Sequence, residues 1–502
     1  MDERSSVLQE LRRESLDIYN RLHSIADDAA FVAHVHEFYP ALPLVPNLRC
    51  GAWYTDPAIA SNVPAYFKST DGHFNNWSFN LRRPNLHLLP LIAEHHGIVL
   101  VDSTRAGKRI PDALSKTVPI WCAVVNRAIA RRFPGPDGNA WDTALYTPPG
   151  AVSAQEHHQI EQRIDAWADA LFNSSFELPA LPAPLRPFWI TPATTTFPSF
   201  PTFEPLPFHP VICLSASRPS DDTRRLGGFG YIQGSGDDHE LWSMGLTPTH
   251  YWRHTTALLA ASRSELPGVI RTILSSDCGD GTLTTDEHPL TERGGVTSIA
   301  KVGGRMKLCT FRELGRARWD EDEAYVFLPA TPDSSHLPQD QEVTDARRLV
   351  LPLAPRIKNH LTLTLLPRAL PFIGEQLALG QNVYVVCGGE TTNEEAEVGD
   401  EGVAVLLTAL VLFFCGEGVL RPPQFASPAE LPETVLEMSE ASTEMKEVEQ
   451  RRGKVVIPPG IDKTCIRTRL EWIIACRPGV NPARATLKRV NEFLMSGEHG
   501  RR

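Results

Sequence analysis

Short apolar runs that end in polar loops recur along this chain, and they constrain its fold more than any other feature. Residues 98–101 (IVLV) lead into the loop DSTRAGKR, and residues 383–387 (VYVVC) lead into a glycine-containing loop. Similar runs stand at 209–217 (HPVICLSAS) and 324–329 (AYVFLP). Continuous apolar runs of this length are typical of buried strands.

Amphipathic helical patterns separate these runs. Leucine and isoleucine follow a helical spacing between residues 8 and 25. Thr117 with Pro119 marks the start of a helix, and Ser153 with Glu156 has the spacing of a capping box. Strands that alternate with helices predict an α/β fold with at least two domains.

A length of 502 residues suggests two or three domains. We predict an N-terminal catalytic region over residues 1–320 and a C-terminal domain over residues 321–502. Residues 177–210 contain ten prolines, which predicts a stiff connector without regular structure. Two acidic stretches, 390–402 and 428–450, flank an apolar helical segment and are expected to be mobile insertions.

Charge is distributed unevenly along the chain. Lys and Arg number 49 against 60 Asp and Glu, a net charge of −11 that argues against a nucleic-acid partner. Residues 390–449, however, carry 14 acids and 2 bases, whereas residues 68–132 carry 10 bases and 4 acids. Residues 451–502 have a net charge of +8. The negative balance therefore belongs to one segment, and two basic segments remain for an anionic partner.

Nine scattered cysteines without a C-x-x-C pair fit reduced thiols better than a disulfide framework or a zinc site. The longest apolar run, residues 403–415, is too short to span a bilayer, and the charged N-terminus lacks the apolar core of a secretory signal. We therefore expect a soluble, cytoplasmic protein with no membrane partner.

A first candidate cluster lies between residues 67 and 83. Asp71 and His73 flank a glycine, so both side chains can sit on one tight turn, with Lys68, Arg82 and Arg83 nearby. An Asp–His pair suits acid–base chemistry if the two meet in a cleft. The alternative interpretation is a surface turn with a helix cap.

A second cluster follows the strand predicted at 98–101. Its loop contains Arg105, Lys108 and Arg109, with Lys116 further on, and these residues suit a phosphate group. The Walker motif G-x-x-x-x-G-K-[ST] is absent, and Asp102 is the one acid at the strand end. A solvated basic turn is the alternative.

A third cluster is GDDHE at 236–240. The adjacent carboxylates of Asp237 and Asp238 could hold Mg²⁺ together with substrate phosphates. Adjacent acids in a glycine-rich loop can equally well be solvated.

The run 383–387 followed by GGE is similar to the cysteine loop of a cysteine-dependent phosphatase. That chemistry needs a thiolate and an arginine six residues later, but the position six residues after Cys387 is Asn393. The loop is also acidic, so Cys387 is predicted to be a structural thiol.

Several segments resemble one family, the initiator-tRNA phosphoribosyltransferases of fungi and plants (tRNA adenosine-64 2′-O-ribosylphosphate transferases). The matching segments run from residue 20 to residue 495. The most distinctive are YFKSTDGHFNNWSFNLRRPNLHLL, VDSTRAGKRIPDALSKTVPIWCAVVNR and YIQGSGDDHELW. One departure is Glu390, which stands where the family is expected to have a basic residue.

The resemblance implies transfer of 5-phosphoribosyl from phosphoribosyl pyrophosphate to the ribose 2′-hydroxyl of adenosine 64 in initiator methionyl tRNA, which excludes this tRNA from elongation. It also implies a dual-specificity-phosphatase-like fold for the C-terminal domain. Mg²⁺ is expected as cofactor, on Asp237 and Asp238. Asp71 or His73 is the candidate base. The candidate substrate-binding residues are Lys68, Arg82, Arg83, Asp102, Thr104, Arg105, Lys108, Arg109 and Lys116.

The basic tail is the candidate tRNA-binding surface, because Lys and Arg side chains bind RNA phosphates. Its candidate residues are Arg467, Arg469, Arg484, Lys488 and Arg489. The alternative is an ordinary basic helix that balances the acidic insertion. Two other functions stay open: a non-catalytic tRNA-binding protein with a pseudophosphatase docking domain, and a phosphatase that works through Cys387.

Overall fold

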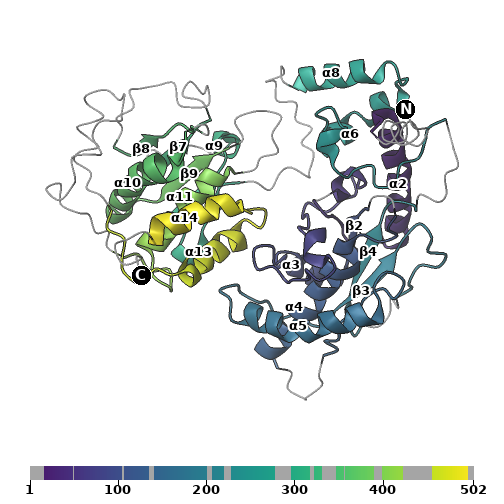
Figure 1. Cartoon of the computed structure of the whole chain (residues 1–502), viewed down its shortest axis with the longest axis horizontal. Coiled ribbons are helices and arrows are strands. Elements are labelled where there is room, and N and C mark those ends of the chain that lie inside the picture. Colours follow the sequence, from purple (N-terminus) through teal and green to yellow (C-terminus); the bar gives the residue numbers. More distant parts are fainter. Residues whose placement is uncertain are drawn as a thin grey trace, which may run out of the picture. The chain divides into compact units, whose positions relative to one another are not determined.

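The computed structural model describes residues 16–48, 50–104, 107–134, 141–200, 206–219, 228–277, 295–316, 322–330, 346–354, 357–388, 398–421 and 455–495. It divides into two compact units, Met1–Arg293 and Gly294–Arg502 (Figure 1). The division lies before the predicted boundary at 320/321, because strands β5 (Thr297–Ser298) and β6 (Met306–Cys309) pair within the sheet of the second unit. Both units are α/β, as the alternating pattern predicts.

The N-terminal unit is built on a four-stranded parallel sheet. Its spatial order is β1-β2-β4-β3, and each neighbouring pair runs parallel. All five residues of β2 are buried, as are all seven of β4, which explains their continuous apolar sequence. The strands are β1 (Leu44–Pro46), β2 (Ile98–Asp102), β3 (Leu185–Ile190) and β4 (His209–Ser215).

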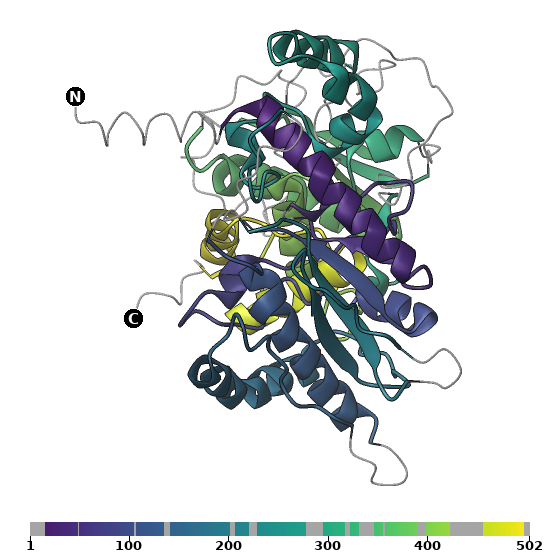
Figure 2. The ribbon, with the colours of Figure 1, turned by 90° about the vertical axis from the view of Figure 1, so that its right-hand side faces the viewer.

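Helices cover both faces of this sheet (Figure 2). On one face, α2 (Ile18–Phe38) packs through Leu22 and Ile25 into a core shared with Val99 and Ile212. On the other face, α4 (Val118–Arg132) contacts β3, and Asn126 of α4 exchanges hydrogen bonds with the backbone of Leu185. The other α-helices in the described part of this unit are α3 (Leu88–His95), α5 (Ala154–Phe172), α6 (Pro248–Arg253), α7 (Thr255–Ala260) and α8 (Leu266–Asp277).

The prediction that residues 177–210 lack regular structure is wrong for β3 and for the start of β4. Pro187 lies inside β3, where it pairs with Val211, and Pro210 lies in β4. Because β3 is an edge strand, a proline without an N–H group can face away from the partner strand there. Proline density therefore marked an edge strand rather than a connector alone.

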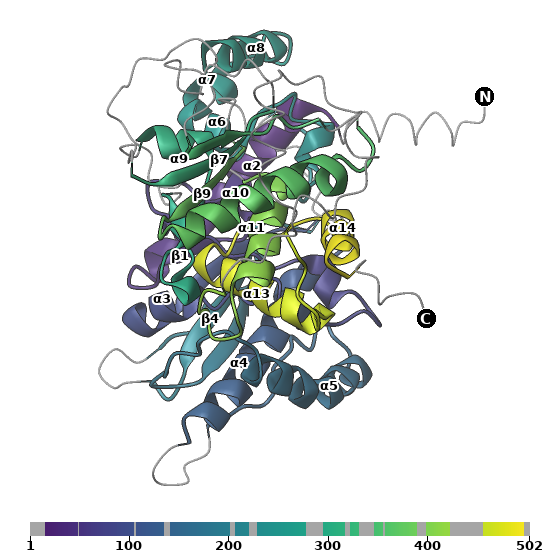
Figure 3. The ribbon, with the colours of Figure 1, turned by 90° about the vertical axis from the view of Figure 1, so that its left-hand side faces the viewer.

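The C-terminal unit contains a five-stranded sheet with the order β5-β6-β9-β7-β8, in which only β5 is antiparallel to its neighbour. Helix α11 (Asp400–Phe413) is almost wholly buried and contacts α10, α13 and α14 (Figure 3). The other elements are α9 (Phe311–Arg316), β7 (Ala324–Leu328), β8 (Arg348–Val350), α10 (Leu366–Ala378), β9 (Val383–Cys387), α13 (Lys463–Cys476) and α14 (Arg484–Met495).

The predicted acidic insertions have different outcomes. Residues 400–402 belong to the first turn of α11, so the end of the 390–402 stretch is helical. Acidic side chains suit this position because the helix dipole is positive there. The stretch 428–450 lies outside the described residues. Among the described residues, no helix combines the length and apolar character that crossing a bilayer requires.

Candidate active site

The candidate site of the N-terminal unit is built on polar residues at the carboxyl ends of its parallel strands, where α/β sheets usually bind ligands. Asn47 follows β1, and Asp102 is the last residue of β2. Asp102 is fully buried and accepts hydrogen bonds from Asn47 Nδ2 (3.1 Å) and Cys50 Sγ (3.0 Å). Its carboxylate therefore orders the strand ends and is not exposed to a ligand.

Asn47 connects this strand edge to the first predicted cluster. Its side chain donates to the carbonyl of Phe67 and accepts from the N–H of Phe67, both at 2.8 Å. The same amide also binds Asp102, so all of its polar atoms have partners in the protein. Phe67 immediately precedes Lys68 and the helical turn η2 (Ser69–Gly72), and this turn is thereby fixed beside β2.

The first and second predicted clusters touch each other. Turn η2 packs against the π-helical turn η3 (Ala113–Thr117), and Thr117 Oγ1 donates to the carbonyl of Lys68 at 3.1 Å. Gly72 is essential to this contact, because a Cβ atom there would lie 2.7 Å from the carbonyl oxygen of Asp112. Two segments about 40 residues apart are thus joined into one site.

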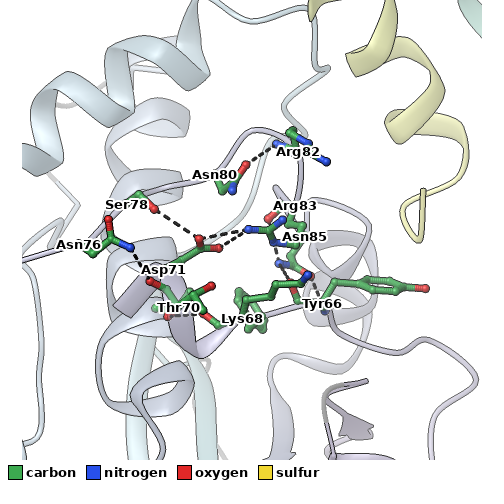
Figure 4. Close-up of polar contacts among 12 residues, drawn as sticks. Tyr66, Lys68, Thr70, Asp71, Asn76, Ser78, Asn80, Arg82, Arg83 and Asn85 are labelled. Atoms are coloured by element: carbon green, nitrogen blue, oxygen red, sulfur yellow. Dashed lines mark hydrogen bonds and ion pairs between the residues drawn. The ribbon is translucent and has the colours of Figure 1, made fainter. Parts of the chain in front are cut away.

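Asp71 is buried in an ion pair. Nη2 of Arg83 donates to Oδ1 (3.1 Å) and Oδ2 (2.8 Å) of Asp71, and Ser78 Oγ lies 3.5 Å from Oδ1 (Figure 4). The two charged side chains are only 12% and 11% exposed. A small pocket adjoins the pair, lined by residues that include Asp71, Arg83, Thr117 and Trp121. Arg83 neutralises the carboxylate, which weakens Asp71 as a candidate base.

His73 has a different environment. Its side chain is 52% exposed, and Nε2 lies 3.8 Å from Oδ2 of the buried Asp112. Asp112 also binds the ammonium groups of Lys108 and Lys116. Burial by itself would raise the pKa of Asp112, but the hydrogen bonds and charges of these two lysines hold it below its ordinary value. Asp112 therefore stays ionised beside His73, with its negative charge already paired to two lysines.

Lys116 is buried between two carboxylates. Its Nζ lies 2.9 Å from Asp112 and 3.2 Å from Glu156 of α5, and Glu156 also accepts from Trp77 Nε1 at 3.0 Å. Lys116 therefore links η3 to α5 and, through Glu156, to Trp77. Because it is only 6% exposed, it is not accessible to a ligand.

The remaining cationic candidates are placed at the surface or partly buried. Lys68, Lys108 and Arg109 are exposed, and Arg82 is half-buried. Thr104 is buried at the start of the basic loop, and Arg105 lies outside the described residues.

The third predicted cluster lies next to the second. Gln233 Nε2 donates to the carbonyl of Lys108 at 2.6 Å, and the N–H of Gly234 donates to Ser217 beyond β4. Asp237 is half-buried, and Asp238 is exposed with a left-handed backbone (φ 47°). Within the described part of the chain, no group of three or more His, Cys, Asp or Glu side chains is arranged to hold a metal ion. These two carboxylates therefore fit Mg²⁺ only with ligands from substrate or water.

The basic tail residues do not form one surface. Arg484, Lys488 and Arg489 are exposed on α14, and Arg467 is exposed on α13. Arg469 is only 4% exposed and donates to the carbonyl of Phe414 at 3.0 Å, so we leave it out of the proposed tRNA-binding set.

Cys387 lies fully buried at the end of β9. A Cβ atom at Gly399 would lie 2.8 Å from its Sγ, and one at Gly402 would lie 2.6 Å from its Cβ. The start of α11 therefore packs directly on the thiol, an arrangement that agrees with a structural role. Asn393, which stands where phosphatase chemistry would need an arginine, lies outside the described residues.

Comparisons with known proteins identify both units. The model of the Rit1 N-terminal domain matches residues 11–275, and that of the Rit1 DUSP-like domain matches residues 349–494. The chain belongs to the Rit1 family. The first match covers the candidate site of the N-terminal unit. The second confirms the phosphatase-like C-terminal fold expected from the sequence.

Two curated relatives of this Rit1-family chain come from yeasts. An uncharacterized protein of Schizosaccharomyces pombe is 41% identical over 284 residues, 55% of this chain and 61% of the relative. The tRNA A64-2′-O-ribosylphosphate transferase of Saccharomyces cerevisiae is 39% identical over 287 residues, 52% of this chain and 55% of that enzyme. The chain thus spans less than two thirds of the length of either relative. No solved structure matches it.

Sequence reasoning missed the residues that hold this Rit1-family site together. Asp112 carried a usable signal, since Lys108 and Lys116 stand four residues before and after it. Asn47 and Glu156 carried none, because their partners are distant in the sequence.

Proposed function

We propose that this protein transfers the 5-phosphoribosyl group from phosphoribosyl pyrophosphate to the ribose 2′-hydroxyl of adenosine 64 in initiator methionyl tRNA, and so keeps that tRNA out of elongation. The observation that carries the proposal is the meeting of three separately predicted clusters at one edge of a parallel sheet. This edge lies within residues 11–275, which match the Rit1 N-terminal domain.

The donor has a 5-phosphate and a pyrophosphate, so its site must supply several positive charges. Lys68, Lys108 and Arg109 are exposed beside the strand edge and would bind phosphate oxygens. Lys108 also contacts Asp112 but its side chain is 52% exposed, whereas Lys116 and Arg83 are buried in their ion pairs and position the turns. Arg105 and Thr104, in the same loop, stay within the proposed donor site.

His73 is our preferred base. Asp71 is engaged by Arg83, whereas His73 is half-exposed and lies near the fixed charge of Asp112. When the imidazole takes the proton from the 2′-hydroxyl, the resulting imidazolium would lie 3.8 Å from the Asp112 carboxylate and share it with Lys108 and Lys116. The hydroxyl oxygen then forms the new bond to the ribosyl carbon as pyrophosphate leaves.

Asp237 and Asp238 are the residues that would hold Mg²⁺. When bound, the ion would neutralise charge that develops on the leaving pyrophosphate. For tRNA, the proposed contacts are the exposed side chains of Arg484, Lys488 and Arg489 on α14 and of Arg467 on α13. We propose a cytoplasmic location, because translation takes place there.

A transfer assay tests the proposal. Protein, Mg²⁺ and labelled phosphoribosyl pyrophosphate are incubated with initiator tRNA, and elongator tRNA serves as the control. Label should appear on initiator tRNA at adenosine 64. Binding of tRNA without any covalent product would instead support a non-catalytic tRNA-binding protein.

The base assignment has its own test. His73→Ala should lower the rate of transfer by 10²-fold or more, as expected for a lost general base. The matched control is His34→Ala, which removes an exposed histidine paired with Glu37 on α2. If His73→Ala transfers at a near-normal rate, His73 is not the base.

A further inference from the structure

Helix α2 presents a polar stripe to the glycine-rich loop 228–238. Asn20, Ser24 and Asp28 are spaced four residues apart, so they lie on one face of the helix. All three are at least 95% buried. A buried polar stripe is costly unless each group has a partner, and here the partners belong to that loop and to the strand ends beside it.

The first two residues of the stripe bind the loop backbone directly. Asn20 Oδ1 accepts from the N–H of Gly230 at 3.1 Å, and Ser24 Oγ accepts from the N–H of Ile232 at 2.9 Å. The next helix position, Arg21, donates to the carbonyl of Ser235 at 2.8 Å. Backbone groups of the loop at Gly230, Ile232 and Ser235 are therefore bound by side chains of α2.

Asp28 joins the loop to the sheet. Its Oδ1 binds the hydroxyl of Tyr231 at 2.7 Å, and its Oδ2 binds Ser217 Oγ at 2.6 Å. Ser217 in turn accepts from the N–H of Gly234 (3.2 Å) and bonds Ser103 Oγ (2.6 Å) after β2. One carboxyl group thus connects α2, the loop and the ends of β2 and β4.

Among the described residues, the groups that contact Asp28 or lie near it are neutral at pH 7. They are Tyr231 of the loop, Ser217 and the backbone of Arg218 after β4, and the more distant Tyr54. The guanidinium of Arg218 instead binds Asp27, on the surface side of α2. Burial raises the pKa of Asp28 to about 8, so the carboxyl group keeps its proton at neutral pH.

We propose that Asp28 is a positioning residue of the transfer reaction, which fixes the loop 228–238, and with it Asp237 and Asp238, at the carboxyl edge of the sheet. The inference rests on the proposed function for its link to catalysis. Its structural part, the dependence of the loop on Asp28, stands independently.

Two variants separate the hydrogen bonds of Asp28 from its charge. Asp28→Ala removes both bonds, whereas Asp28→Asn keeps an acceptor for Tyr231 and a donor for Ser217 without a titratable proton. Asp27→Asn is the matched control, because it changes the neighbouring carboxylate that binds Arg218 at the surface.

In steady-state transfer, Asp28→Ala should raise the KM for phosphoribosyl pyrophosphate tenfold or more, with the Kd for tRNA unchanged. Asp28→Asn should restore the wild-type KM at pH 7. Wild-type activity should fall above about pH 8 as Asp28 ionises, and Asp28→Asn should remove that decline. A wild-type KM in Asp28→Ala, or an equally raised KM in Asp28→Asn at pH 7, would overturn the proposal.

Hydrogen exchange separates failure of this inference from failure of the proposed function. Asp28→Ala should speed amide exchange at Gly230, Ile232 and Gly234, while the amides of α4 and α5 keep wild-type protection. This result is independent of any transfer activity. Unchanged exchange in the loop would reject the positioning role even if the protein is a transferase. If Asp28→Ala instead loses protection throughout the protein, exchange in the loop is measured in Asp28→Asn at pH 7 and pH 9.

Discussion

Two buried carboxyl groups in the N-terminal unit have opposite surroundings. Asp112 is bound by two lysines, and its pKa is lowered, whereas Asp28 is bound by hydroxyl groups, and burial raises its pKa to about 8. A group whose pKa is lowered in the folded state stabilises the protein above its unfolded pKa, and this contribution is lost as pH falls. A group whose pKa is raised in the folded state stabilises the protein below its unfolded pKa, and this contribution is lost as pH rises. The two residues therefore give stability opposite dependences on pH.

For Asp28 the dependence is expected between about pH 4 and pH 8. The unfolded carboxyl group has a pKa near 3.9, so over this interval the folded protein holds a proton that the unfolded chain has released. Stability is then lost as pH rises to about 8 and levels off above it. Asp28→Asn should melt higher than wild type by a margin that widens from pH 5 to pH 8, measured by circular dichroism. The same margin at both pH values would show that the pKa of Asp28 is not raised.

For Lys116 we expect a large loss of stability on replacement by Met. The change leaves the buried carboxylates of Asp112 and Glu156 without their shared cation, and breaking a buried pair costs on the order of 3 kcal/mol. Urea unfolding at pH 7 measures this cost. The deficit should shrink below about pH 4, where the pairing contribution of Asp112 is lost from the wild type as well.

Lys108→Met provides the comparison for that experiment. Lys108 binds the same Asp112 carboxylate but is 52% exposed, so its loss should cost less than about 1 kcal/mol. Equal costs for Lys108→Met and Lys116→Met would contradict a structural role specific to Lys116.

At the scale of elements, the contact between η2 and η3 aligns the two clusters of the candidate site. Gly72 permits this contact, since a Cβ atom there would lie 2.7 Å from the carbonyl oxygen of Asp112 and 2.8 Å from Thr117 Oγ1. A backbone carbonyl cannot move aside as a flexible side chain can. Any larger residue must therefore separate the two turns.

Gly72→Ala should accordingly lower kcat/KM for transfer tenfold or more, with a stability loss of about 1–3 kcal/mol, typical of overpacking. Gly150→Ala is the control, because an added Cβ at Gly150 meets no atom within 4 Å. Wild-type transfer by Gly72→Ala would show that the spacing of η2 and η3 does not matter for the reaction.

At the scale of the whole molecule, charge is separated by segment. The net charge of −11 hides exposed cations on α14, where Arg484, Lys488 and Arg489 share a helix of the C-terminal unit. Surface cations of this kind bind RNA through phosphates and release counterions. Binding should consequently depend steeply on salt despite the acidic total.

Replacing these three residues together by Ala should weaken tRNA binding and reduce the slope of log K against log salt by about 2. Arg131→Ala is the control, since Arg131 of α4 is already paired with Asp165 and Asp169. The measurement is a tRNA titration at several salt concentrations. An unchanged slope in the triple variant would place the tRNA surface elsewhere.

Local sequence patterns predicted those elements whose environment is uniform along their length. The runs at 98–101 and 383–387 are apolar throughout because β2 and β9 lie inside their sheets. Ser153 caps α5 as its spacing predicts, through a bond from the N–H of Glu156. Strand β3 was missed, because its tolerance of Pro187 depends on an edge position that no local pattern reveals.

The sequence by itself determined the α/β class, the family and the three segments suited to phosphate chemistry, since each is carried by neighbouring residues. Tertiary structure alone decided which charges are available. Arg83, Lys116 and Arg469 look in the sequence like Lys108 and Arg109, yet their side chains are buried against protein partners, whereas Lys108 stays half-exposed although it also contacts Asp112. The role of Asp28 could not be inferred from the sequence for the same physical reason. Its pKa is raised by burial, and the residues that surround it are nearly 200 positions away in the chain.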